Sequence, residues 1–198
     1  MKELSPYILK KISNNLDHFF NLATNKQIRD GQSWYKNANL EANKIAKKHN
    51  LDVLKVSGVI SALSPRNKWK RNLIDADAVC NAYKNNIGPS FIKVCTFNNN
   101  KLKSFGILAG SVKITDKSLK TYNFVNNIAY LDNDFLTVDI WHLRACFNNM
   151  ININSASIGK KAYKQIKDLT IKKAKKIGLT GFEFQAIIWL SAQKNINK

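Results

Sequence analysis

The feature that most constrains the fold is the scarcity of helix-breaking residues in a chain whose apolar residues recur at helical spacing. The 198 residues include only 8 glycines and 3 prolines, and these do not cluster. Apolar residues three and four positions apart are typical of helices that bury one face, and the sequence shows no convincing alternating pattern of the kind that predicts a strand. We therefore expect an all-α protein, and the 44% content of hydrophobic residues is enough to fill a helical core.

The same spacing predicts the approximate extents of the helices. They cover about residues 6–22, 33–49, 52–63, 68–86, 90–97, 117–129, 139–149, 155–176 and 181–194. Ser33, Asp52 and Ser155 are expected to cap the second, third and eighth of these, because their side-chain oxygens can accept hydrogen bonds from free backbone N–H groups. The asparagine run at 98–100 predicts a loop, and Gly178 predicts the end of the eighth helix.

The domain organisation is expected to be one compact unit with two helical lobes. No linker rich in Pro, Gly or Ser divides the chain. Residues 52–150 would form a central lobe, and the helices of residues 1–51 and 151–198 would flank it and form the second lobe. We expect the protein to be a monomer.

The charge of the chain points to a polyanionic partner. There are 32 Lys and Arg residues against 13 Asp and Glu, which gives a formal net charge of +19. So large an excess repels itself unless it faces an anion, and nucleic acid is the first candidate. An anionic membrane is the alternative, but the sequence has neither an apolar run of spanning length nor a lipidation motif. The basic segment 155–176 and the loop 66–71 are the expected phosphate contacts.

The cysteines and the N-terminal segment indicate a reducing, cytoplasmic setting. Cys80, Cys95 and Cys146 are odd in number and widely spaced, which fits neither a disulfide framework nor a zinc or iron–sulfur ligand set. We expect buried, reduced thiols and neither a metal nor an organic cofactor. Residues 1–15 lack the apolar run of a signal peptide, and the abundance of Lys and Asn is typical of an AT-rich genome such as that of a phage.

Two residues are candidates for catalysis. Asp139 lies in the segment VDIWHLR, directly before an expected helix, where its simplest role is an N-cap that contributes about 1 kcal/mol. Lys120 lies 19 residues earlier, in a helix that Thr115 or Asp116 would cap, and its simplest role is a surface charge. The apolar face beside Lys120 would strip water from the amine and favour its neutral, nucleophilic form. An amine held next to a carboxylate can attack a sugar carbon and break an N-glycosidic bond.

A third segment, SPRNKW, follows an apolar helix and is rich in groups that bind nucleic acid. Its candidate DNA-binding residues are Ser64, Arg66, Asn67, Lys68 and Trp69. Cations hold phosphates, Asn and Arg side chains can fill the space left by a displaced base, and Trp can stack on a base. The plainer interpretation is that Trp69 belongs to the core and that the cations are ordinary surface charges.

Together and in this order, the three segments resemble the helix-hairpin-helix DNA glycosylase superfamily, which includes endonuclease III and 8-oxoguanine DNA glycosylase. The family carries a Val-Asp-x-His-x-x-Arg motif with a catalytic Asp, and this chain matches it at Val138, Asp139 and Arg144. Bifunctional members carry a catalytic Lys just after the hairpin, and Lys120 falls on that position. The resemblance spans about residues 52–150 and implies a bilobed helical bundle of the helix-hairpin-helix glycosylase type.

The chain departs from the family pattern in the hairpin and in the motif. The family has Gly-x-Gly where backbone amides approach a DNA phosphate, and here Asp116 and Ser118 occupy those positions. The hairpin is therefore degenerate, and Lys113 and Lys117 are expected to supply phosphate contacts instead. Trp141 stands where the family usually has His.

The resemblance implies a DNA glycosylase with AP-lyase activity that excises a modified or damaged base from an everted nucleotide. Lys120 would form a Schiff base with the deoxyribose, Asp139 would assist, and Arg144 would contact the DNA. The base pocket would draw on Trp34, Trp141 and Phe182, although core packing is the plainer explanation for such residues.

Two other functions stay open from the sequence. An enzyme of phage thymine hypermodification on the same scaffold would keep Asp139 and replace a leaving group on a base substituent, leaving the sugar intact. A non-enzymatic basic DNA-binding protein would use Asp139 only as a helix cap and Lys120 only as a surface charge.

Overall fold

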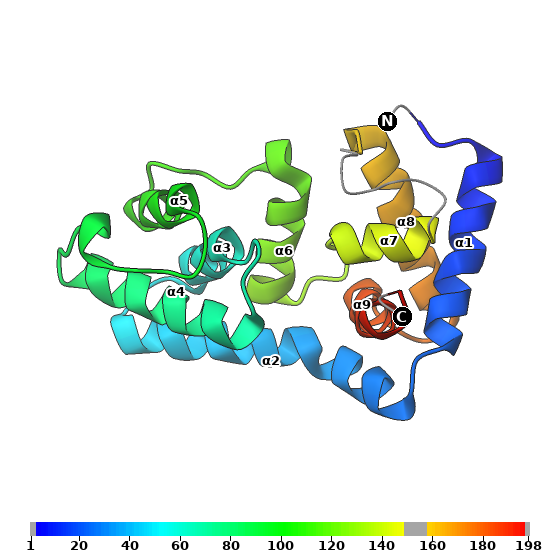
Figure 1. Cartoon of the computed structure of the whole chain (residues 1–198), viewed down its shortest axis with the longest axis horizontal. Coiled ribbons are helices and arrows are strands. Elements are labelled where there is room, and N and C mark those ends of the chain that lie inside the picture. The colour runs from blue at the N-terminus through cyan, green and yellow to red at the C-terminus, as the bar shows by residue number, and fades with distance from the viewer. Residues whose placement is uncertain (1–2, 149–157, 197–198) are drawn as a thin grey trace. The chain divides into compact units, whose positions relative to one another are not determined.

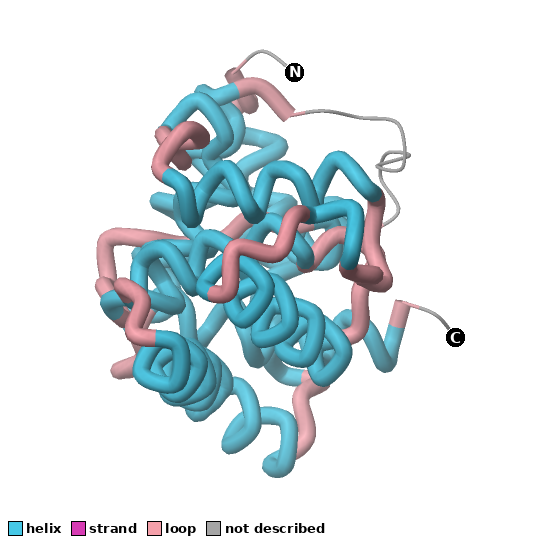
Figure 2. Tube along the Cα trace, turned by 90° about the vertical axis from the view of Figure 1, so that its left-hand side faces the viewer, coloured by secondary structure: helices cyan, strands magenta, loops and turns pink. Residues whose placement is uncertain are grey.

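The computed structural model describes residues 3–148 and 158–196, and over these residues the protein is all-α, as expected. Figure 2 shows helices joined by loops and no strand in the described part of the chain. Ser155, expected to cap the eighth helix, lies outside the described residues. Over the same two stretches, no helix is both long enough and apolar enough to cross a membrane.

The chain divides into two compact units. Unit 1 consists of Met1–Lys36 and Asp132–Lys198, and unit 2 consists of Asn37–Leu131. Asp139, which the sequence grouped with residues 52–150, therefore belongs to the unit that contains both ends of the chain. Lys120 belongs to unit 2.

Unit 1 is a cluster of helices around α9. Its elements are α1 (Pro6–Asn21), the first part of α2 (Asn25–His49), α7 (Ile140–Phe147), α8 (Lys160–Lys176) and α9 (Gly181–Asn195). α9 contacts α1, α7 and α8, and α1 also contacts α7 and α8 (Figure 1). Buried Phe19, Ile166, Phe184 and Ile187 form part of the core.

Two local features fix the position of α9. A capping box starts the helix: Glu183 N donates to Thr180 Oγ1 at 3.2 Å, and Thr180 N donates to Glu183 Oε2 at 3.0 Å. Gly31 of α2 lies so close to α9 that an added Cβ would be 2.7 Å from the backbone nitrogen of Ile187. A residue larger than glycine at this point would force the two helices apart.

Unit 2 is built around α3. Its elements are the second part of α2, α3 (Val53–Leu63), α4 (Trp69–Lys84), η1 (Pro89–Phe91), α5 (Asn98–Ala109), η2 (Asp116–Ser118) and α6 (Leu119–Tyr130). α3 contacts α4, α5 and α6 (Figure 1), which explains why its residues 56–63 are all buried. The expected cap is confirmed, because Asp52 Oδ1 accepts from Leu54 N at 2.8 Å.

The expected start of α2 at Ser33 is wrong, because the helix begins at Asn25. Thr24 and Gln27 form a reciprocal cap there: Thr24 N donates to Gln27 Oε1 at 2.9 Å, and Gln27 N donates to Thr24 Oγ1 at 3.3 Å. Ser33 lies inside the helix, where its hydroxyl donates to the carbonyl oxygen of Arg29 at 3.1 Å. A serine that can cap a helix can also bond back to the preceding turn, and here it does the second.

The expected helix at 90–97 and the expected loop at 98–100 are also wrong. Only Pro89–Phe91 form a short 3₁₀ turn, and the helix α5 covers Asn98–Ala109. The segment between them is held by a long-range contact, since Cys95 N donates to Asp75 Oδ2 at 2.8 Å. Such contacts override the local apolar spacing that predicted a helix.

Candidate functional site

Asp139 is the N-cap residue of α7. Its backbone is extended, with φ −95° and ψ −178°, and its Oδ1 accepts a hydrogen bond from His142 N at 2.8 Å. The capping role expected from the sequence is therefore confirmed. The side chain is half-buried, so this carboxylate is fixed in orientation and only partly hydrated.

Tyr163 of α8 holds the extended segment that leads to Asp139. Its hydroxyl accepts from Val138 N at 3.0 Å and donates to the carbonyl oxygen of Leu136 at 3.1 Å. Buried backbone groups outside regular structure need such partners. Because Tyr163 is itself buried, α8 fixes the backbone on the N-terminal side of the carboxylate.

His142 ties α7 to α8 from the other side of the cap. Its Nε2 lies 3.0 Å from Thr170 Oγ1, and that hydroxyl donates its own proton to the carbonyl oxygen of Ile166 at 2.8 Å. Thr170 can therefore only accept from His142, which places the imidazole proton on Nε2. Nδ1 has no hydrogen-bond partner among the described residues, and burial lowers the pKa of His142 to about 4.

The carboxylate of Asp139 also faces buried ionisable side chains of unit 1. Burial raises the pKa of Tyr35 far above its usual value of 10; a hydrogen bond with Thr137 opposes the rise, and the negative charge of Asp139 adds to it. Burial, and secondarily Asp139, also raises the pKa of the Cys146 thiol. Burial and the electrostatic effect of Asp139 both oppose ionisation of Tyr35 and Cys146, so both groups stay neutral.

Two of the three candidate base-pocket residues meet through Tyr35. The Tyr35 ring lies 4.6 Å from that of Trp34 and 5.6 Å from that of Phe182, centroid to centroid. Trp141 is separate from this cluster and packs under the guanidinium of Arg144, whose Cζ is 4.5 Å from a Trp141 ring centroid. Phe182 is buried whereas the two tryptophans are half-buried.

Lys120 lies in the first turn of α6 and is exposed. The apolar face of its helix therefore does not cover the amine, and the expectation that this face strips water from Lys120 is wrong. The preceding 3₁₀ turn contains Asp116 and Ser118, and Thr115 caps this turn by accepting from Lys117 N at 3.4 Å. The expectation that Thr115 or Asp116 caps the helix of Lys120 is wrong, because Ser118 is the N-cap residue of α6.

The turn before Lys120 needs no glycine. Asp116 and Ser118 are not among the residues with positive φ, so the backbone adopts this turn with ordinary side chains. Lys113 and Lys117 are exposed, which agrees with the phosphate contacts expected of them. The structure thus accounts for the absence of the Gly-x-Gly pattern at this position.

Asp75 organises the loop of residues 64–68, although it was not among the residues expected to matter there. This buried carboxylate accepts from Asn67 Nδ2 at 3.0 Å, Arg71 Nε at 2.8 Å and Cys95 N at 2.8 Å. Asn67 is therefore a structural residue here, engaged with Asp75, rather than a side chain that projects from the loop. Three donors around one carboxylate hold the loop and the 92–97 segment in fixed positions.

The exposed tip formed by these two segments consists of Arg66 and Phe97. Arg66 adopts a left-handed conformation with φ +57°, and its Cζ lies 5.5 Å above the centre of the Phe97 ring. Phe97 is 54% exposed, although aromatic rings usually prefer burial. A side-chain bond from Thr96 Oγ1 to the carbonyl oxygen of Pro65, 3.0 Å long, links the two segments directly.

The remaining candidates of this loop have different surroundings. Ser64 ends α3 and donates to the carbonyl oxygen of Ser61 at 2.9 Å. Lys68 precedes α4 and is exposed, and Trp69 begins that helix and is half-buried. Lys68 thus suits a phosphate contact, while Ser64 mainly serves the backbone.

The candidate residues fall into one set in each unit. Unit 2 holds the loop residues, Lys113, Lys117 and Lys120, and unit 1 holds Asp139, Arg144 and the aromatic residues. Sequence reasoning missed Asp75, Phe97 and Tyr163. For these three residues the usable signal in the sequence was that Asp75 follows Arg71 by one helical turn. This spacing also suits an ordinary surface ion pair.

The cysteines only partly meet the expectation of buried thiols. Cys80 and Cys146 are buried, but Cys95 is exposed. Burial, with a smaller effect from Asp77, raises the pKa of Cys80 to about 12, so this thiol is inert at neutral pH. Among the described residues, no group of three or more His, Cys, Asp and Glu side chains could hold a metal ion.

Comparison with known proteins assigns a family to the chain without assigning an activity. No curated protein and no solved structure matches it. A family model does match, and it covers residues 1–196. The chain therefore belongs to the family of unknown function DUF7178.

Proposed function

We propose that this protein is a DNA glycosylase with AP-lyase activity that excises a modified or damaged base. The observation that carries the proposal is the placement of Asp139. Hydrogen bonds from Tyr163 to the preceding backbone and from His142 N to the carboxylate fix this acid beside neutral buried groups. An acid that is held in one orientation and partly dehydrated stabilises positive charge more strongly than one in free solvent.

The proposed chemistry uses the amine of Lys120 and the carboxylate of Asp139 on one deoxyribose. The neutral amine attacks C1′, the N-glycosidic bond breaks, and the base leaves with the bonding electrons and takes up a proton. Asp139 accepts or orients the amine proton and stabilises the cationic sugar. The sugar ring of the C1′ adduct then opens: the C1′–O4′ bond breaks, O4′ takes up a proton and an iminium ion forms between C1′ and the lysine nitrogen. Loss of a C2′ proton from this ion expels the 3′ phosphate through cleavage of the C3′–oxygen bond, which nicks the strand.

The tip formed by Arg66 and Phe97 supports a role with everted nucleotides. Rotating a nucleotide out of the duplex costs about a few kcal/mol of stacking and pairing. A planar guanidinium over an aromatic ring can occupy the vacated space and restore stacking. The bonds of Asp75 and Thr96 keep the tip in place before DNA binds, so little ordering is required on binding.

Borohydride trapping tests the lyase step. The wild-type protein should form a covalent adduct with duplex DNA that contains an abasic or oxidised site, and Lys120→Ala should form none. Lys84→Ala removes an exposed lysine of α4 in the same unit and should trap as well as the wild type. Adduct formation by Lys120→Ala at the wild-type level would refute the assignment.

Asp139→Asn tests the acid without disturbing the fold. Asn caps helices about as well as Asp, so its side-chain oxygen can still accept from His142 N. Base release should fall by about 100-fold or more, while DNA binding and the thermal transition should stay close to those of the wild type. Equal loss of binding and base release would show that Asp139 is structural only.

A non-enzymatic DNA-binding protein is the second candidate function. The exposure of Lys120 and the capping role of Asp139 are compatible with it. Strong, salt-dependent DNA binding with neither base release nor adduct on any lesion would favour this function.

A further inference from the structure

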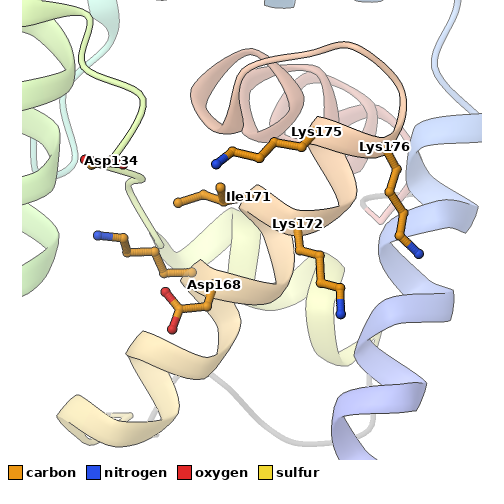
Figure 3. Close-up of a pocket in the computed structure, with 7 residues that line it drawn as sticks. Asp134, Asp168, Ile171, Lys172, Lys175 and Lys176 are labelled. Atoms are coloured by element: carbon orange, nitrogen blue, oxygen red, sulfur yellow. The ribbon is translucent and has the colours of Figure 1, made fainter.

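An open groove runs along the outer side of α8 in unit 1. It has a volume of about 760 Å³ and is lined by Asp134, Lys167, Asp168, Ile171, Lys172, Lys175 and Lys176. Figure 3 shows Lys175 and Ile171 on the side of α8 that faces Asp134, and Lys172 and Lys176 on its other side. The lysines that line the groove therefore lie on both sides of α8, and the half-buried Ile171 lies on the side that faces Asp134.

The lysines of the groove lack acidic partners. Within the described ranges, no carboxylate forms an ion pair with Lys172, Lys175 or Lys176. The neighbouring Lys173 differs, because its Nζ lies 2.7 Å from a carboxylate oxygen of Asp17. The described part of the protein thus pairs Lys173 with an acid of α1 and leaves Lys172, Lys175 and Lys176 without an ion pair.

Like charges at this spacing oppose the helix that carries them. Lys172 and Lys176 are one turn apart, and Lys175 lies three residues after Lys172, so their charges repel on the helix surface. Part of this cost is offset by the favourable position of cations at a helix C-terminus. An anion in the groove would offset the remaining repulsion between the lysines. A chain of phosphates matches several cations in succession better than a single ion does.

Lys167 adds an aromatic neighbour to the groove. Its Nζ lies 5.6 Å from the centre of the Phe135 ring, so the ammonium is held near the loop that contains Asp134. Phe135 belongs to the segment that leads to Asp139, and Lys167 packs on that segment. The groove is consequently a neighbour of the proposed catalytic acid within the same unit.

We propose that this groove binds the phosphodiester backbone of the DNA strand that flanks the reacting nucleotide. Asp134 and Asp139 are five residues apart, so at most about 17 Å of extended chain separates them. With about 3.4 Å of duplex per nucleotide, the phosphates bound at the Asp134 edge of the groove lie within about five nucleotides of the everted one. Only this placement relative to the reacting nucleotide rests on the proposed function; backbone binding itself does not.

The salt dependence of DNA binding tests the groove. The probe is a fluorescein-labelled duplex that carries a tetrahydrofuran abasic-site analogue, and binding is followed by fluorescence anisotropy over a series of salt concentrations. The triple variant Lys172→Gln, Lys175→Gln and Lys176→Gln should lose about three phosphate contacts. The slope of log K against log salt concentration should therefore become shallower by about 2 to 3.

A matched variant controls for net charge. Lys10→Gln, Lys47→Gln and Lys84→Gln remove the same charge from exposed lysines of α1, α2 and α4 that do not line the groove. Its salt slope should stay within about 0.5 of the wild-type value. Equal slopes in the two triple variants would overturn the proposal.

Asp168→Asn gives a test in the opposite direction. This exposed acid lines the groove and repels phosphate, so its neutralisation should tighten DNA binding about threefold at low salt. Weaker or unchanged binding would contradict the assignment. This variant gains affinity, so impaired folding cannot produce the expected result.

Two further measurements separate the remaining explanations. If the groove variant loses binding to phosphatidylserine vesicles but keeps its affinity for DNA, the groove is a membrane contact and the proposal fails. Ethylation of phosphates within about five nucleotides of the abasic site should weaken binding of the wild type and not of the groove variant.

If the groove variant shows the predicted slope but the wild type releases no base, backbone binding stands and the glycosylase proposal falls. If borohydride traps an adduct of the wild type but the groove variant keeps the wild-type salt slope, the glycosylase proposal stands and the groove proposal falls.

Discussion

The buried imidazole of His142 should make unit 1 sensitive to mild acid. Burial holds the pKa of His142 at about 4, well below its ordinary value of 6.5. Between these two values the unfolded chain binds a proton that the folded protein does not. The free energy of unfolding should therefore fall as the pH drops below 6.5 and level off for this residue near pH 4.

The size of the effect follows from the same two values. One pH unit corresponds to about 1.4 kcal/mol for a single proton, so the full interval from 6.5 to about 4 amounts to about 3 kcal/mol. Between pH 7 and pH 5 the loss should be about 2 kcal/mol. Glu183 contributes only at lower pH: burial raises its pKa, but hydrogen bonds with Thr180 and Lys36 outweigh this and lower it below 4.5.

The assay is urea unfolding followed by tryptophan fluorescence, since three of the four tryptophans lie in unit 1. The matched control is His142→Gln, whose amide can donate to Thr170 as Nε2 does but does not titrate. The variant should lose most of the pH dependence between pH 7 and pH 5, whatever its stability at neutral pH. If the free energy of unfolding of the variant changes with pH as steeply as that of the wild type, the assignment of this effect to His142 is refuted.

Two other substitutions probe packing and the loop of unit 2. Gly31→Ala should destabilise unit 1 by about 1–3 kcal/mol in urea unfolding, because the added methyl group meets the backbone of Ile187; a gain of about 1 kcal/mol, as helix propensity alone predicts, would contradict this. Asp75→Asn should cost about 3 kcal/mol by the same measurement, because one of the two acceptor oxygens becomes an NH₂ donor and at least one donor is left without its acceptor. Asp77→Asn, at a partly exposed acid of the same helix, should cost about 1 kcal/mol or less, and equal losses would show that burial of Asp75 has no special effect.

Features that depend on a few neighbouring residues could be predicted from the sequence. The all-α class follows from apolar spacing, and the caps at Asp52 and Asp139 follow from the position of an acid before an apolar helix. Gly178 has a positive φ of +73° just after α8, as expected of a residue that ends a helix. In each case the partner atoms lie within four residues along the chain.

Features that depend on distant partners could not be predicted. Asp75 binds Cys95 across 20 residues, and this bond holds a segment in a non-helical conformation although its own pattern favours a helix. Tyr163 reaches Leu136 across 27 residues, and nothing in either local sequence marks the pair. The exposure of Phe97 is likewise set by the segments around it, because a lone Phe in a sequence predicts burial.

If the groove along α8 binds a polyanion as proposed, the two faces of this helix separate that binding from the geometry around Asp139. Tyr163 and Thr170 are buried and maintain the geometry around Asp139, whereas Lys172, Lys175 and Lys176 are exposed. Exchange of those lysines for neutral residues can therefore change the affinity for the proposed polyanion without moving the carboxylate of Asp139. A lineage of such proteins can adapt to a different ionic environment through one side of a single helix.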